Sequence, residues 1–433
     1  MAVLQEIVAD PRLQNRPSPS LRVNFKWTLA GNLVYSLCQW GMLSVLAKAG
    51  SVSIVGQFAL GLAISAPVFM FTNLALRAVQ VTDGSREYRF ADYFTLRFLT
   101  TMMGLLVVAI VVSTSRYDKV TRAVILLVAL AKSVECLSDV IGGLLQLHER
   151  LDQAAVSLMI RGALSLLLFG ATFLLSHSLI ACTAAMCFTW LAVLAGYDLR
   201  RARDALAPGE PCFYLDWRAE RKLILLTLPL GFVTMLLSLN GNFPRYLIEH
   251  YGGPAQLGIF ASMAYLLVAL STIVNALGQS ATVRLSSMFA TRDLDGFRRL
   301  MFKLVAIGFA ILVLGLPLAA AFGRTMLTLL YRPEYGDSLV AFLIMVAASG
   351  VSAVASFLGY GMTAARCFRA QVPLTAACTL TTVLATSVLV PHHGLVGAAL
   401  GLLASATVLA VGCALVLRTT IGRAQQAQLD LEI

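Results

Sequence analysis

The stretch ILLVALAKSVECLSDVIGGLLQL, from Ile125 to Leu147, decides the fold of this chain. It is long enough to cross a bilayer, because about 20 helical residues span the hydrocarbon core. It nevertheless contains Lys132, Glu135 and Asp139, whose spacing places all three on one helical face. Each charge at the bilayer centre costs roughly 2.5–3.5 kcal/mol. This face therefore lines a wet cavity, or its lysine and glutamate form a structural bridge between helices.

The composition points to a polytopic membrane protein. Of the 433 residues, 58% are hydrophobic and only 13% are charged, whereas a soluble domain has about 25% charged residues. The net charge of +11 comes from residues between apolar segments, so we expect no nucleic-acid partner. The eight cysteines form no CxxC motif, so we expect no metal site, and nothing in the sequence indicates a cofactor.

Twelve apolar segments predict an all-α protein with about twelve transmembrane helices. They lie at about 27–47, 53–76, 97–114, 121–146, 155–176, 178–197, 223–247, 255–280, 300–322, 338–362, 371–390 and 394–417. Most of the 33 lysine and arginine residues fall where an N-inside chain has its cytoplasmic ends, which predicts that both termini are cytoplasmic. Pro67, Pro229 and Pro244 lie within spans, and we expect an irregular helix at Pro244 in particular.

The two halves of the chain repeat each other. Gly56-Gln57-Phe58-Ala59 corresponds to Gly258-Ile259-Phe260-Ala261, and Asn73 corresponds to Asn275 at the same offset. Both halves begin on the predicted cytoplasmic side, so the repeat is parallel. The expected organisation is a disordered cytoplasmic arm (1–22), a six-helix lobe (23–197), a cytoplasmic linker (198–222), a second six-helix lobe (223–417) and a cytoplasmic tail (418–433).

Polar side chains recur in spans of both halves and predict a shared cavity between them. The candidate cavity residues are Lys132, Arg245, Arg77, Asn32, Gln39, Asn73, Asn240, Asn242 and Asn275. For any single Asn or Gln, the alternative is an interhelical hydrogen bond worth about 0.6 kcal/mol. Arg77 could instead anchor the topology at a helix end. Arg245 could instead snorkel to the interface or pair with Glu249.

Short motifs along about residues 22–417 resemble those of one transporter family. They are Gly56-Gln57-Phe58-Ala59-Leu60, Asn73-Leu74-Ala75-Leu76-Arg77, Phe90-Ala91-Asp92-Tyr93, Pro244-Arg245-Tyr246, Tyr331-Arg332-Pro333-Glu334-Tyr335 and Gly394-Leu395-Val396-Gly397-Ala398-Ala399. The chain is similar to the oligosaccharide-lipid flippases of the O-antigen and exopolysaccharide type. These belong to the MATE-like multidrug/oligosaccharidyl-lipid/polysaccharide (MOP) superfamily.

The resemblance implies two six-helix lobes around a central cavity, alternating access, and a location in the bacterial cytoplasmic (inner) membrane. It implies that a polyprenyl-diphosphate-linked oligosaccharide is flipped from the cytoplasmic to the periplasmic leaflet. Lys132, Arg245 and Arg77 are then expected to contact the head group. Glu135 and Asp139 are candidates for a coupling proton or cation. Membrane lipids are further expected partners, and association with polysaccharide assembly proteins stays open.

Two other functions remain as alternatives. A MATE-type drug or cation antiporter would favour acidic cavity residues in an apolar pocket, whereas the candidates here carry both signs. An integral membrane glycan polymerase or ligase would be expected to have a sizeable outer loop, and the predicted outer loops are short. The sequence contains no Walker A, GxSxG or HExxH motif, so we expect that the protein is not an enzyme.

Overall fold

The computed structural model describes residues 21–83, 87–206 and 209–432, which form helices and no strands. The predicted disordered arm therefore lies almost wholly outside the described residues. The helices are α3 (Leu21–Ala49), α4 (Val52–Thr72), α5 (Leu76–Thr82), α6 (Phe90–Thr114), α7 (Lys119–Leu147), α8 (Leu151–Ser176), α9 (Leu179–Val193), a π-helical turn η1 (Leu194–Asp198), α10 (Leu199–Ala205), α11 (Trp217–Ala290), α12 (Leu294–Leu330), α13 (Pro333–Gly336), α14 (Leu339–Ala364) and α15 (Phe368–Glu432).

The described helices account for twelve membrane crossings. Nine helices are long and apolar enough to span a bilayer. Two of them, α11 and α15, are broken at Gly253 (φ 72°) and Gly394 (φ 52°), a backbone conformation that glycine adopts readily, so each makes two crossings. The charged helix α7, with 29 residues, is the twelfth. The predicted all-α polytopic fold is confirmed.

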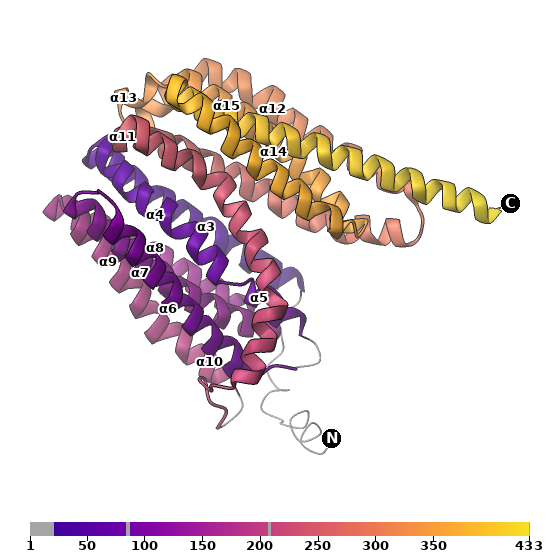
Figure 1. The fold of residues 1–433 in the computed structure, drawn as a ribbon, viewed down its shortest axis with the longest axis horizontal. Coiled ribbons are helices and arrows are strands. Elements are labelled where there is room, and N and C mark those ends of the chain that lie inside the picture. The colour runs from indigo at the N-terminus through magenta and orange to yellow at the C-terminus, as the bar shows by residue number, and fades with distance from the viewer. Residues whose placement is uncertain (1–20, 84–86, 207–208, 433) are drawn as a thin grey trace.

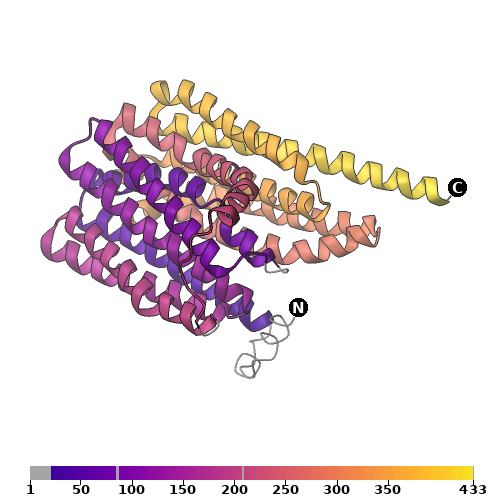
Figure 2. The same ribbon diagram turned by 60° about the horizontal axis from the view of Figure 1, so that its bottom comes forward.

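The helices form two bundles that meet at one end and diverge toward the other. Figure 1 shows α3 to α10 in one bundle and α12, α14 and α15 in the other, with α11 running between them. The bundles approach each other at the end where α13 lies. In both views the C-terminal half of α15 projects beyond the bundle (Figures 1 and 2).

Two glycines allow the bundles to touch at the end where they meet. A Cβ atom added to Gly56 on α4 would lie 1.7 Å from the carbonyl oxygen of Pro254 on α11. One added to Gly258 would lie 2.0 Å from the carbonyl oxygen of Val52. Gly56 and Gly258 are equivalent in the internal repeat, and so are Val52 and Pro254. The parallel repeat in the sequence thus appears in space as one contact made twice.

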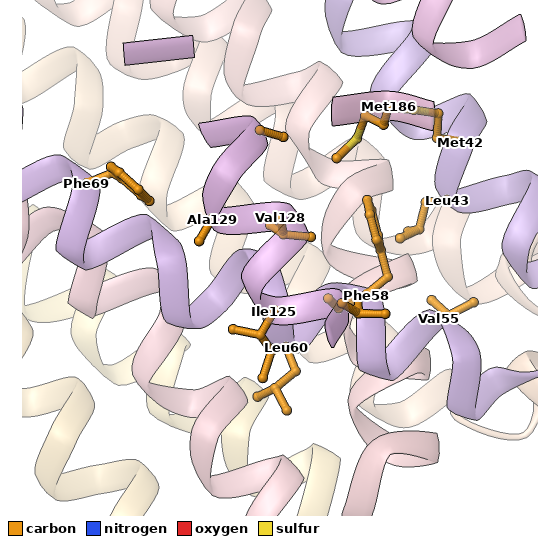
Figure 3. Packing of buried hydrophobic residues seen from close by; sticks show 14 of the residues in the cluster. Met42, Leu43, Val55, Phe58, Leu60, Phe69, Ile125, Val128, Ala129 and Met186 are labelled. Atoms are coloured by element: carbon orange, nitrogen blue, oxygen red, sulfur yellow. The ribbon is translucent and has the colours of Figure 1, made fainter. Parts of the chain in front are cut away.

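The first bundle packs around α7, the helix with the charged stripe. Phe58 and Leu60 of α4 and Ile125 and Val128 of α7 are at most 2% exposed, and Figure 3 shows them close together. Leu175 on the outside of the bundle is 86% exposed, as suits a side chain facing lipid tails. Ile125 and Val128 share a helical face with Lys132, Glu135 and Asp139, so this face of α7 fills the core in its first half and carries the charges further along.

The irregular helix lies at a different place from the one that the prolines predict. The backbone of α11 stays helical at Pro244, so the expectation of a break there is wrong. Besides the breaks at Gly253 and Gly394, a break separates α4 from α5, where Leu74 and Ala75 have φ values of 50° and 49°. A left-handed conformation costs roughly 1–2 kcal/mol per such residue. Arg97 compensates by donating from Nη1 to the carbonyl oxygen of Asn73 at 2.9 Å.

Candidate functional site

The lysine and glutamate of the charged stripe are paired with each other. Lys132 Nζ lies 2.6 Å from Glu135 Oε2 and 5.6 Å from the ring centroid of Trp190. Tyr35 on α3 donates its hydroxyl to Glu135 Oε1 at 3.0 Å. The bridge lies within α7, and this hydroxyl ties it to α3. Its two side chains remain 28% and 27% exposed, so the pair still faces open space.

That space is a cavity of about 350 Å³ in the first bundle, on the side that faces α11. Its lining includes Asn73 at the end of α4, Arg97 of α6, Thr234 of α11, and Lys132, Glu135 and Asp139 of α7. Thr234 donates its hydroxyl across the bundles to the carbonyl oxygen of Met70 at 2.8 Å. The charged stripe therefore forms an internal bridge and at the same time lines a cavity that the first bundle shares with Thr234 of α11.

Asp139 holds two arginines at the cavity wall. Its carboxylate oxygens lie 3.1 Å from Arg77 Nη1 and 3.2 Å from Arg97 Nη2. Arg97 is fully buried and also donates to the side-chain oxygen of Asn73. Arg77 donates from Nη2 to Gln146 Oε1 at 3.0 Å and is 38% exposed. Two arginines facing one carboxylate leave an excess positive charge beside the cavity.

The substitution Asp139→Asn should destabilise the protein. It leaves Arg97 buried without its carboxylate, and removing one partner of a buried ion pair costs about 3–5 kcal/mol. Asp139 is 31% exposed, so we expect about 3 kcal/mol and a clear drop in melting temperature of the purified protein. The matched control is Asp337→Asn, because the Arg324–Asp337 pair is three-quarters exposed and should contribute at most about 1 kcal/mol. Equal melting temperatures for both variants would contradict the assignment.

A second ion pair, which sequence reasoning missed, lies inside the first bundle. Arg161 of α8 and Asp198 of η1 are both 3% exposed, with Nη2 and Oδ2 3.2 Å apart. Ser138 and Ser157 donate to the same carboxylate at 2.7 and 2.6 Å. These residues line a cavity of about 140 Å³ that Asn32 also reaches. Their place near predicted cytoplasmic span ends made them look like ordinary surface residues.

Arg245 has no acidic partner. Its Nη1 donates to Asn242 Oδ1 at 3.2 Å, and its Nε is buried without an acceptor. In the described part of the chain no carboxylate lies within 4 Å of Arg245. Glu249, the partner considered from the sequence, instead accepts from the Tyr117 hydroxyl at 3.5 Å. Arg245 therefore carries an uncompensated charge.

Tyr265 connects this charge to the stripe on α7. Its phenol interacts electrostatically with Arg245, with Lys132 and with Tyr35. Arg245 and Tyr265 belong to α11, and Lys132 belongs to α7 in the other bundle. Cations from both halves of the molecule thus lie in the electrostatic neighbourhood of one phenol.

Several of the predicted amides are used within the protein. Asn240 Oδ1 accepts from the hydroxyls of Thr382 (2.5 Å) and Ser405 (3.1 Å) on α15, as the interhelical alternative expects. Asn275 Oδ1 accepts from Tyr360 at 3.3 Å. Asn73 and Asn242 accept from Arg97 and Arg245, as described above. Within the described chain, Asn32 donates to the carbonyl oxygen of Thr28 in α3, and Gln39 Nε2 is buried without a hydrogen-bond partner.

Neutral phenols reinforce the end where the bundles meet. Tyr331, at the end of α12, accepts from Trp40 Nε1 at 2.9 Å and donates to the carbonyl oxygen of Ser262 at 3.1 Å. Burial raises the pKa of both Tyr331 and Tyr335 to about 12. Both phenols therefore keep their protons at neutral pH, and the contact contains no charge that must be dehydrated.

Solved structures share this two-bundle arrangement. An inward-facing multidrug resistance MATE family transporter of the MOP superfamily superposes with a TM-score of 0.74, over 90% of this chain and 96% of that one, at 12% identity. The chain has the MATE fold. An outward-facing MATE transporter gives a TM-score of 0.62, over 96% and 98% of the two chains, at 14% identity. A MOP superfamily transporter from Pyrococcus furiosus, described as having a binding pocket of reverse polarity, gives 0.61 at 14% identity over 96% and 98%.

Sequence comparison adds one relative outside the set of MATE structures. The chain is 28% identical over 386 residues to the capsular polysaccharide biosynthesis protein CapF of Staphylococcus aureus, covering 87% of this chain and 94% of that protein. No family model matches the chain. The resemblance drawn from the sequence is thereby confirmed for the MATE fold, and the capsular relative is similar to this chain along most of its length.

Proposed function

We propose that this protein is a transporter that flips a polyprenyl-diphosphate-linked oligosaccharide from the cytoplasmic to the periplasmic leaflet. The observation that carries the proposal is the charge in and beside the cavity that Lys132 lines. In its lining, Arg97 and Lys132 balance Glu135 and Asp139. Arg77, which pairs with Asp139, and Arg245, which has no carboxylate within 4 Å in the described chain, add two cations and bring the net charge of the six groups to +2. A diphosphate supplies the complementary negative charge. The MATE fold and the capsular relative support the same conclusion.

The chemistry of such a substrate fits the cavity wall. A diphosphate and a sugar chain cannot cross hydrocarbon without replacement hydrogen bonds. Arg245 offers a guanidinium fork that suits phosphate oxygens, and the residue is only partly buried. Lys132 and Arg77 are the further proposed head-group contacts, because each keeps part of its side chain exposed. The polyprenyl tail stays in the bilayer while the head group passes between the bundles.

The conformation described here fits the step in which the transporter binds its substrate from the cytoplasmic side. The bundles are closed at the end of Gly56 and Gly258, which the N-inside topology assigns to the periplasmic side. The cavity then opens toward the cytoplasm, where the substrate is made. The higher TM-score with the inward-facing MATE structure than with the outward-facing one agrees with this assignment.

A drug or cation antiporter is the second candidate, because the structural relatives include multidrug transporters. The excess of positive charge at the cavity disfavours a cationic drug as cargo. We also propose that the protein is not an enzyme and that it resides in the bacterial inner membrane. Glu135 and Asp139 remain proposed coupling groups, although both are paired with cations in this conformation.

The decisive experiment is deletion of the gene followed by chemical analysis of lipid-linked glycans. The proposal expects complete repeat units to accumulate on the cytoplasmic face, and expression of the chain from a plasmid should clear them. Normal glycan export in the deletion strain, together with loss of resistance to cationic drugs, would instead favour the antiporter.

Reporter fusions test the proposed topology. A reporter that is active only in the periplasm should be silent when fused after Gly209 in the segment between the bundles. It should be active when fused near Gly253, where α11 is broken. The basic residues at the predicted cytoplasmic ends are the physical reason. The opposite pattern at the two sites would invert the proposed direction of loading.

A further inference from the structure

Glu220, in the first turn of α11, is a buried carboxyl group that the proposed transport cycle does not use. Its side chain is 0% exposed, and neither carboxyl oxygen has a hydrogen-bond partner among the described residues. No Lys, Arg or His nitrogen of the described chain lies within 4 Å of it. Glu135, Asp139 and Asp198, by contrast, each face at least one cation.

Among the described residues, the charged groups that act on Glu220 are both acidic. They are Asp92, in the first turn of α6, and Asp216, which caps α11. Asp92 accepts a hydrogen bond from the backbone N–H of Arg89, and Asp216 accepts one from the backbone N–H of Arg218. Both carboxylates therefore cap the first turns of their helices. The basic residues of the same turn of α11, Arg218, Arg221 and Lys222, are exposed to solvent.

Three physical effects therefore oppose ionisation of Glu220. The group is removed from water, it has no donor to replace the lost hydrogen bonds, and its neighbours are acids. The neutral, protonated carboxyl is the form that this packing accommodates. Deprotonation would place a bare charge between α6 of the first bundle and α11, the helix that carries Arg245.

We propose that Glu220 is a proton-binding site whose occupancy holds the start of α11 against the start of α6. Loss of the proton to water leaves a carboxylate that is stable only once hydrated, so the first turn of α11 moves away from Asp92. The consequence for transport rests on the proposed function, because α11 joins the two bundles that alternating access moves. Proton binding itself does not depend on any substrate.

The test uses purified full-length protein in lipid nanodiscs and no substrate. Spin labels on cysteines introduced at the exposed positions 89 and 218, in a background without native cysteines, report the distance between α6 and α11. We expect this distance to lengthen as the pH rises. Infrared spectra should show the loss of a protonated carboxylic acid band over the same pH range. Glu220→Gln should remove that band and keep the short distance at every pH.

The control is Glu87→Gln, which alters an exposed carboxylate close to α6 in sequence and should behave like the parent. A pH-dependent distance or an acid band that persists in Glu220→Gln would overturn the proposal. Glu220→Met, apolar and of similar size, should also insert and fold; failure of both variants to fold would show that a charge is required and would equally overturn it. If the parent chain failed to restore glycan export in the deletion strain, but its α6–α11 distance and acid band still changed with pH, the result would count against the flippase function alone.

Discussion

Replacing Gly56 or Gly258 with alanine should abolish transport by preventing closure of the bundles. The new Cβ atom would fall 1.7 or 2.0 Å from a backbone carbonyl oxygen of the other half. A carbonyl within a helix cannot rotate away, so the two helices must separate. We expect a cost of at least about 3 kcal/mol for the closed conformation, near the upper end for overpacking, which lowers its population by a factor of more than about 100.

Thiol labelling measures this loss of closure directly. A cysteine placed at Thr234, on the cavity wall, should be protected from a membrane-impermeant reagent added from the periplasmic side in the parent. It should react in Gly56→Ala and in Gly258→Ala, and the two variants should match because their contacts are equivalent. The control is Gly359→Ala on α14, where an added Cβ has no neighbour within 4 Å. Parent-like protection and polysaccharide export in both variants would show that this contact does not close the transporter.

Arg245→Ala should nearly eliminate surface polysaccharide in a complemented deletion strain, at normal levels of inserted protein. The guanidinium has an unused buried Nε and no carboxylate within 4 Å in the described chain, so alanine removes a cation that only the substrate balances. Arg245→Lys should restore export only in part, since an ammonium group keeps the charge and loses the fork. A snorkelling or structural cation would instead tolerate lysine with little loss.

The matched control for this experiment is Arg324→Ala. Arg324 also belongs to the C-terminal half, but its side chain is 74% exposed and its pair with Asp337 is open to solvent. We expect full export from that variant. Full export from Arg245→Ala as well would remove Arg245 from the proposed binding site.

The crossings and the repeat were determined by the sequence alone. A span requires about 20 consecutive apolar residues, which is a local property that hydropathy reports without knowledge of neighbours. The match of Gly56 with Gly258 aligned the second span of the first half with the second span of the second half. In the structure these two glycines make equivalent contacts where the bundles meet. The stripe of Lys132, Glu135 and Asp139 followed from helical spacing, because residues three and four apart share a face. The cavity beside it was likewise expected.

Only the tertiary structure decided which of these polar groups are paired. Arg97 and Asp139, or Arg161 and Asp198, are far apart in the chain and meet because particular helices adjoin with particular faces turned inward. Helical periodicity defines a face but not the neighbour toward which that face is turned. The sequence therefore could not tell whether Asn240 lines a cavity or bonds to another helix. For the same reason the sequence could not reveal that Arg245 lacks the Glu249 partner four residues away. Nor could it show that Glu220 is buried against acids, because pairing depends on three-dimensional distances that no local pattern contains.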